Sequence, residues 1–218
     1  MTHYLELENG EELYCSKIIC VGRNYNAHIE ELNNTKPTEP MYFIKPNSAI
    51  VTEGQRIFLP KFSTNIHHEV ELAVVIGKSG KHIPKDRVND YILGYGIGLD
   101  LTARDLQTEL KEKGYPWEKA KAFDGSCPIS KIRLKENVTS HNDLEIELKI
   151  NNEVRQHSRT SRMIFDVETL ISDASNYFTL QKGDIILTGT PEGVGQVKSG
   201  DILIGTIENV GQFHFEAV

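Results

Sequence analysis

The sequence predicts a mostly-β α+β protein, in which a rolled or barrel-like mixed sheet is accompanied by short helices. Strand-type runs outnumber helical patterns, and the two do not alternate as they would around a parallel sheet. Short turn signals such as Asn9-Gly10 separate the runs, and no internal repeat or long linker divides the chain. We therefore expect residues 1–218 to form a single domain.

Strands are expected where short runs of β-branched and apolar residues end at turn residues. These runs are Lys17–Val21, Met41–Ile44, Glu69–Ile76, Leu144–Ile150, Asp184–Thr188 and Ile202–Val210. The pair Asn151-Asn152 predicts a hairpin turn after the fourth run. Helical pattern covers about Tyr25–Leu32, about Thr102–Glu112 and, behind Asp166 as N-cap, about Val167–Phe178.

Composition and charge exclude several classes of function. The chain has 31 acidic and 24 basic residues, a net charge of −7, and no Lys/Arg-rich block, which argues against a nucleic-acid or anionic-membrane partner. No apolar run is long enough for a membrane-spanning helix. The N-terminus lacks the pattern of a secretory signal and is too acidic for an organelle transit peptide, so we expect a cytoplasmic location.

The three cysteines are not arranged for a disulfide framework or a zinc site. Cys15, Cys20 and Cys127 give an odd number and contain no Cys-x-x-Cys pair. We expect all three to be buried thiols without a chemical role.

The most informative segment is His67-His68-Glu69-Val70-Glu71-Leu72, which continues into an apolar run. Side chains alternate between the two faces of a strand, so Glu69 and Glu71 project from one side, about 6.6–7 Å apart. The apolar continuation predicts that this strand enters the core, where unpaired carboxylates cost several kcal/mol or become protonated. A divalent cation between them would remove that cost. A solvated edge strand with two exposed glutamates explains this segment equally well.

Asp100 is the third candidate ligand. It closes the glycine-rich apolar run Tyr91–Leu99, where a strand gives way to a helix, and carboxylate oxygens suit Mg²⁺ or Mn²⁺. A helix N-cap is an equally good interpretation of this aspartate. The glycines of the run lack the spacing of a dinucleotide-binding loop.

Several segments taken together resemble the fumarylacetoacetate hydrolase family, and its small acylpyruvate hydrolases and oxaloacetate decarboxylases above all. They occur in family order over about residues 17–210. The segments are Cys20–Tyr25, Phe43–Pro46, His67–Leu72, Gly94-Tyr95 through Asp100–Gln107, Lys121–Asp124 and Leu187–Gly195.

The resemblance implies a β-roll-like fold, usually a homodimer, with Mg²⁺ or Mn²⁺ held by Glu69, Glu71 and Asp100. A small oxo-acid such as an acylpyruvate can chelate such an ion through its carboxylate and 2-oxo oxygens. The ion then acts as a Lewis acid that stabilises an enolate. The same electron sink serves hydrolysis, decarboxylation and tautomerisation.

His28 and Glu31 lie one helical turn apart, so the carboxylate can orient the ring. The resemblance implies that this pair activates water, on a segment that orders over the substrate. Without the resemblance, a surface His–Glu pair is the commoner interpretation.

The resemblance also implies a set of substrate contacts. Lys121 matches the active-site lysine of the family and could offset charge on the enolate. Arg104 and Gln107, one turn apart, could reach the far end of the substrate, although helix-surface residues of these types are common. The remaining expected substrate contacts are Arg23, Lys45 and Thr190. His67 could support the metal ligands indirectly.

The leading interpretation is a metal-dependent hydrolase that cleaves a C–C bond in an acylpyruvate-like acid, because the His28–Glu31 pair suits water activation. Oxaloacetate decarboxylation or oxo-acid tautomerisation at the same site is the second. The third is a non-catalytic protein that binds a metal or a small acid.

Overall fold

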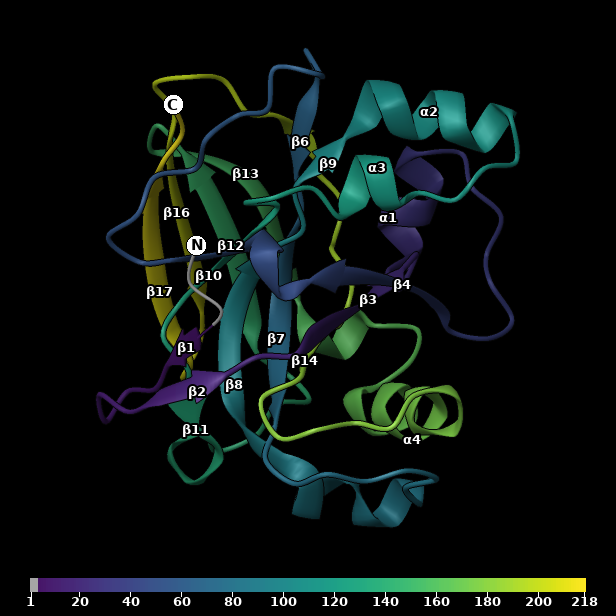
Figure 1. The fold of residues 1–218 in the computed structure, drawn as a ribbon, viewed down its shortest axis with the longest axis vertical. Helices are drawn as coiled ribbons and strands as arrows, with labels where there is room; N and C mark the ends of the chain where they lie inside the picture. Colours follow the sequence, from purple (N-terminus) through teal and green to yellow (C-terminus); the bar gives the residue numbers. More distant parts are fainter. Residues whose placement is uncertain (1–3) are drawn as a thin grey trace.

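The computed structural model describes residues 4–218, and Figure 1 shows a curled sheet flanked by short helices. The largest sheet is mixed, because its pairs β3–β14 and β5–β10 are parallel and the others antiparallel. From one edge to the other its strands are β4 (Met41–Pro46), β3 (Lys17–Gly22), β14 (Ile185–Leu187), β7 (Val70–Ile76), β8 (Ile92–Leu99), β10 (Cys127–Ile129) and β5 (Ile50–Thr52), and β11 (Arg133–Leu134) pairs with β8. The mostly-β prediction is confirmed.

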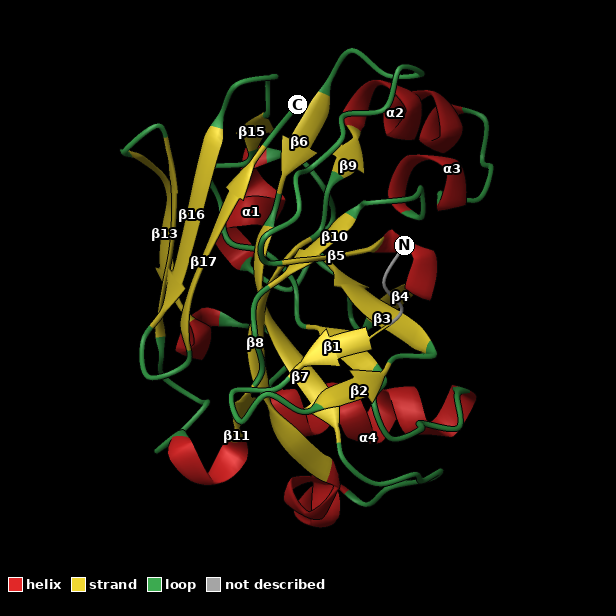
Figure 2. Ribbon diagram, turned by 60° about the vertical axis from the view of Figure 1, so that its left-hand side comes forward, coloured by secondary structure: helices red, strands yellow, loops and turns green. Residues whose placement is uncertain are grey.

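An antiparallel sheet stands on one side of β7 and β8 (Figure 2). Its strands, in order, are β13 (Glu153–Arg159), β12 (Glu145–Ile150), β16 (Ile202–Ile207) and β17 (Gly211–Glu216). The predicted hairpin turn joins β12 to β13, and Asn151 and Asn152 both have positive φ, as this tight turn requires. Smaller units are β15 (Gly195–Gln196) with β6 (Ile66–His68) and β9 (Thr102–Ala103), and the hairpin β1 (Tyr4–Glu6) with β2 (Glu12–Tyr14).

The helices are short, as predicted. They are α1 (Asn26–Glu31), α2 (Arg104–Glu112), α3 (Glu118–Lys121) and α4 (Val167–Tyr177), with 3-10 turns at Asn47–Ala49, Lys85–Tyr91, Lys135–Asn137 and Thr160–Arg162. Asp166 caps α4 as expected and accepts a hydrogen bond from the Thr169 N–H at 2.8 Å. Within residues 4–218, no helix is long and apolar enough to cross a membrane.

Strand β7 is buried on both faces and divides the core. Leu72 and Val74 pack into the cluster shared with the four-stranded sheet. Ala73 and Val75 face the inside of the curled sheet, where Cys15, Cys20 and Cys127 also lie as buried free thiols. Because side chains alternate along a strand, Glu71 projects into this interior with Ala73.

One predicted strand boundary is wrong. The run Glu69–Ile76 was expected to be continuous, but β7 begins at Val70, and the preceding β6 belongs to a different sheet. Glu69 occupies the junction between the two. The helix predicted from Thr102 likewise begins at Arg104, because Thr102 and Ala103 pair with β6 as strand β9.

A buried carboxylate ties the start of β3 to the start of β14. Asp184 is fully buried; it accepts hydrogen bonds from Ser16 Oγ at 2.5 Å and the Gln181 N–H at 2.7 Å, and it forms an ion pair with Lys17. Asp184→Ala should lower the free energy of unfolding by about 3 kcal/mol, because these donors lose their acceptor. Urea denaturation with an unchanged m-value measures this. A loss below about 0.5 kcal/mol would be the size expected of an ordinary surface substitution and would contradict the assignment.

Candidate functional site

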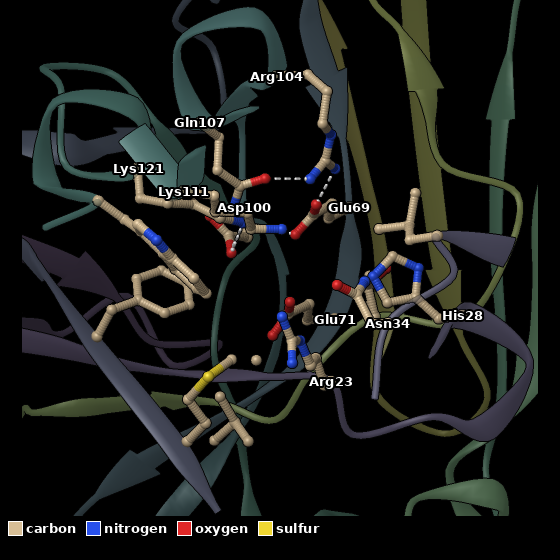
Figure 3. A pocket seen from close by; sticks show the side chains of 17 residues that line it. Arg23, His28, Asn34, Glu69, Glu71, Asp100, Arg104, Gln107, Lys111 and Lys121 are labelled. Atoms are coloured by element: carbon tan, nitrogen blue, oxygen red, sulfur yellow. Dashed lines mark hydrogen bonds and ion pairs between the residues drawn. The ribbon is translucent and has the colours of Figure 1, made fainter. Parts of the chain in front are cut away.

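Three buried carboxylates meet at one end of the curled sheet (Figure 3). The pairing of β7 with β8 places Val70 opposite Leu99, and the Asp100 N–H donates to the Glu69 carbonyl at 2.8 Å. Asp100 therefore lies beside the glutamate strand. One carboxylate oxygen from each of Glu69, Glu71 and Asp100 lies within 4.8 Å of the others. The exposed-edge interpretation of this strand is excluded, because all three side chains are buried.

The positive charges around the three acids are unevenly placed. Lys121 Nζ bridges two of them, at 2.7 Å from Glu69 Oε2 and 2.6 Å from Asp100 Oδ2. Burial opposes the charge on Lys121, but the Asp100 and Glu69 carboxylates raise its pKa. Burial would also raise the pKa of Glu69, yet Lys121 and Arg104 hold it well below its usual range.

Glu71 has no such partner. Among residues 4–218, no Lys, Arg or His lies within ion-pair distance of Glu71, which accepts only the Gly189 N–H, at 2.6 Å. Burial, followed by the Asp100 and Glu69 carboxylates, raises the pKa of Glu71 well above its usual range. A divalent cation would remove this uncompensated charge, and three carboxylate oxygens are the donor set that Mg²⁺ and Mn²⁺ prefer. The residues present therefore fit such an ion.

A cavity opens over the three carboxylates and collects most of the residues predicted from the sequence. Its walls come from β3, α1, α2, α3 and the turn after β14. The predicted residues that line it are Arg23, His28, Glu69, Glu71, Asp100, Arg104, Gln107, Lys121 and Thr190.

His28 and Glu31 lie on α1, and His28 lines this cavity (Figure 3). His28 Nδ1 is 3.4 Å from Glu31 Oε2, an ion-pair distance that does not meet hydrogen-bond geometry. Burial lowers the pKa of His28 even though the Glu69 and Glu31 carboxylates raise it, so the ring is neutral near pH 7. Glu31 is held in turn by the Gly193 N–H, at 3.1 and 3.2 Å from its two oxygens.

Arg104 interacts both with Gln107 and with Glu69, one of the three carboxylates. Arg104 forms an ion pair with Glu69, and its Nη1 donates to Gln107 Oε1 at 2.6 Å. His67 Nδ1 accepts from Arg104 Nε at 3.4 Å, so His67 helps to hold the arginine that pairs with Glu69. Burial and the neighbouring Arg104 lower the pKa of His67 to about 4, which keeps it a neutral acceptor.

Lys45 was expected to contact the substrate, but the structure places its side chain outside the cavity. Lys45 is 0% exposed and is not among the residues lining the cavity. Its ammonium donates to the Leu101 carbonyl, the Lys121 carbonyl and Ser126 Oγ, and it lies 2.9 Å from Asp100 Oδ1. The lysine therefore stands behind Asp100, because a fully buried ammonium needs these acceptors, and it orients that carboxylate.

Sequence reasoning missed Lys111, which lines the cavity beside Arg23. Burial and then the nearby Arg23, Arg104 and Lys121 lower the pKa of Lys111. Among residues 4–218, neither Arg23 nor Lys111 has a carboxylate partner; Lys111 Nζ lies 5.2 Å from the Trp117 ring centre. The spacing Arg104, Gln107, Lys111 (i, i+3, i+7) puts all three on one helical face, and this signal could have revealed the lysine.

Comparison with known proteins assigns the family. The family model described as fumarylacetoacetate (FAA) hydrolase C-terminal matches residues 17–216. The chain belongs to the fumarylacetoacetate hydrolase family, as the sequence motifs predicted. It is 46% identical over 199 residues to the mouse protein named oxaloacetate tautomerase FAHD1, mitochondrial; the match covers 91% of this chain and 90% of that protein.

Solved structures share the fold. A fumarylpyruvate hydrolase from Pseudomonas aeruginosa, in complex with Mn²⁺ and pyruvate, is 37% identical with a TM-score of 0.94, over 99% of this chain and 95% of that one. A 5-carboxymethyl-2-hydroxymuconate delta-isomerase from Mycobacterium smegmatis is 41% identical with a TM-score of 0.84, over 94% and 79%. These relatives are hydrolases, isomerases and tautomerases, so the chain is an enzyme of this family, and we set the non-catalytic interpretation aside.

Glu71→Gln tests the metal centre. The variant should weaken Mn²⁺ binding about 100-fold or more in isothermal titration calorimetry, because a charged ligand is lost. Its metal-free form should be no less stable than the wild type in urea, since the neutral amide replaces a carboxyl group whose ionisation is opposed by burial. Glu30→Gln, an exposed change on α1, is the control and should bind Mn²⁺ normally. Unchanged Mn²⁺ affinity in Glu71→Gln would rule out Glu71 as a ligand.

Proposed function

We propose that this chain is a divalent-metal-dependent enzyme that forms the enol of a small 2-oxo acid, with keto–enol tautomerisation of oxaloacetate as its main activity. The observation that carries this proposal is the buried cluster of three acids that lines one cavity together with His28. The 46% identity to a mouse protein named oxaloacetate tautomerase supports the substrate.

Glu69, Glu71 and Asp100 would hold Mg²⁺ or Mn²⁺. When bound, the ion supplies Lewis-acid stabilisation of negative charge on the substrate oxygens. Lys121, between Glu69 and Asp100, adds a second positive charge at the same place. Thr190 lies on the cavity wall, where its backbone N–H would help to orient the substrate carboxylate, because its hydroxyl donates to the Val70 carbonyl.

His28 is the proposed base. Its Nδ1 faces Glu31, so Nε2 is the nitrogen left for the substrate. The C3–H bond of oxaloacetate breaks and its proton moves to His28. The electron pair forms the C2–C3 double bond, and negative charge develops on the C2 oxygen. Protonation of that oxygen by water gives the enol, and His28 returns its proton to solvent.

Two cations on the cavity wall favour a substrate with a second carboxylate. Arg23 and Lys111 are neighbouring cations without an acidic partner in the described chain, and such a pair is stabilised by an anion. Oxaloacetate has a carboxylate at the end opposite its 2-oxo acid group, whereas the acetyl group of acetylpyruvate is uncharged. This contrast is the reason for ranking oxaloacetate first.

Hydrolysis of an acylpyruvate-like acid, the leading interpretation of the sequence, is the second candidate. The His28–Glu31 pair can activate water as readily as it can accept a proton from carbon. The Pseudomonas aeruginosa relative is a fumarylpyruvate hydrolase and holds pyruvate and Mn²⁺. Decarboxylation of oxaloacetate would use the same electron sink without an activated water.

The homodimer and the cytoplasmic location also remain proposals. The exposed aromatic side chains of Phe58 and Phe62 support a contact with a second copy. Sedimentation of the purified chain at micromolar concentration measures the oligomeric state. The mouse relative is named as mitochondrial, so fractionation of the source cell is needed for the location.

The first functional test follows oxaloacetate by NMR with Mg²⁺ or Mn²⁺ added, and then chelated. Metal-loaded enzyme should accelerate keto–enol exchange, and chelation should abolish this.

Lys111→Met should raise the KM for oxaloacetate about tenfold, since a charge-assisted hydrogen bond contributes about 1.5 kcal/mol. The KM for acetylpyruvate should be almost unaffected. Lys113→Met, which alters an exposed lysine paired with Glu109, is the matched control. Pyruvate release from acetylpyruvate without any oxaloacetate exchange would favour the hydrolase instead.

The second test uses pH. Activity requires neutral His28, so it should fall as the pH drops through the pKa of His28, which lies below the ordinary value of 6.5. Because the Glu31 carboxylate raises this pKa, Glu31→Gln should move the acidic limb of kcat to lower pH. His28→Asn should reduce kcat about 100-fold or more without preventing Mn²⁺ binding. An acidic limb at the same pH in Glu31→Gln would show that His28 is not the titrating base.

A further inference from the structure

The junction at Glu69 leaves the backbone of Val70 without a neighbouring strand on one side. Strand β14 pairs with β7 only as far as Leu187 opposite Ala73, and the Thr188 N–H extends the contact to the Leu72 carbonyl. Beyond this point, side chains take the place of the missing strand. Gln156 Oε1 accepts the Val70 N–H at 3.0 Å, and Thr190 Oγ1 donates to the Val70 carbonyl at 2.9 Å.

Gln156 is a fully bonded buried amide. It is 1% exposed, and its Oε1 also lies 3.0 Å from His68 Nδ1. Its Nε2 donates to Thr190 Oγ1 and to the Pro191 carbonyl, both at 2.8 Å. The amide orientation is fixed twice, because the Val70 N–H can only donate and the Pro191 carbonyl can only accept. His68 must therefore carry its proton on Nδ1.

Strand β13, which carries Gln156, has a bulge next to this residue. The β12–β13 register passes from Leu148 opposite Gln156 to Lys149 opposite Val154, so Arg155 is the extra residue of a bulge. The Arg155 carbonyl lies against Gly193, where an added Cβ would be 2.0 Å from it, and Gly193 has a φ of +92°. Only glycine fits this position.

Two neighbouring residues of β13, Arg155 and Gln156, thus contact different segments around the cavity. Gln156 joins the residue between Glu69 and Glu71 to the turn that carries Thr190. The bulge at Arg155 packs against Gly193, whose N–H holds Glu31 beside His28. Gln156 is not among the residues that line the cavity, so it acts through the groups that do.

We propose that Gln156 is a positioning residue, whose buried amide locks the Glu69–Glu71 segment to the Thr190 turn. Its effect on substrate rests on the proposed function, but its effect on the metal-binding segment does not. The other role open to a buried amide is to satisfy hydrogen bonds and add stability alone. In that case its replacement would lower the melting temperature and leave metal and substrate binding unchanged.

Two substitutions separate the contacts that the Gln156 amide accepts from those that it donates. Gln156→Leu removes all four hydrogen bonds, and should raise both the Kd for Mn²⁺ and the Kd for oxalate measured with Mn²⁺ by about tenfold or more. Gln156→Glu keeps both acceptor contacts but cannot donate to Thr190 or Pro191. It should weaken oxalate binding by about tenfold and should not weaken Mn²⁺ binding, because an added negative charge favours a cation. Ser158→Ala is the matched control, because Ser158 is two residues along the same strand, equally buried, and its Oγ has no partner in the described chain.

Nitrogen-15 NMR of the His68 ring gives a readout independent of activity. The wild type should show the Nδ1–H tautomer, Gln156→Glu should keep a proton on Nδ1, and Gln156→Leu should lose this preference. Wild-type Kd values for Mn²⁺ and oxalate in the folded variants would overturn the proposal, even if the melting temperature fell. If Gln156→Leu does not fold, unchanged oxalate affinity in Gln156→Glu overturns it alone. These measurements need no turnover, so a wild type inactive on oxaloacetate would reject the proposed function and leave this test intact.

Discussion

Charge balance inside one buried cavity is the constraint on which the rest of the structure depends. Three carboxylates lie within 4.8 Å of one another, where the low dielectric makes each unpaired charge costly. Lys121 and Arg104 compensate Glu69, and Lys45 and Lys121 compensate Asp100. Glu71 is left over. A divalent cation, if bound there, would supply the positive charge that Glu71 lacks.

The second requirement is that pieces from distant parts of the chain keep their relative positions. The acids belong to the curled sheet, His28 to α1, and Thr190 to the turn after β14. The four-stranded sheet packs against β7 and β8 through a shared core and also reaches into the site through β13. Packing of the two sheets thus does more than bury apolar surface: it aligns an acid pair, a turn and a helix.

The carboxylate cluster and the His–Glu pair could be predicted from the sequence, because the patterns that indicate them are local. Alternation through Glu69 and Glu71, an acid at the end of a strand, and a His and a Glu one helical turn apart are all visible in one dimension. The motif order adds the family. Lys111 was missed although its helical spacing was legible, and Gln156 was missed because an isolated glutamine in a polar strand carries no signal of its four partners. The substrate contact of Lys45 was expected from the family resemblance alone, and its burial cannot be known from a lone lysine in an apolar run.

The sequence by itself determined the secondary-structure class, the residue types available for a hard metal ion and the membership of the family. Only the tertiary structure decided which acid lacks a compensating cation, which lysine stands behind the ligands and which faces the cavity, and where the glutamate strand breaks. The physical reason is that local pattern sets the direction of a side chain relative to its own strand or helix. Desolvation and ion pairing instead depend on atoms that are far away in the chain and meet only after folding.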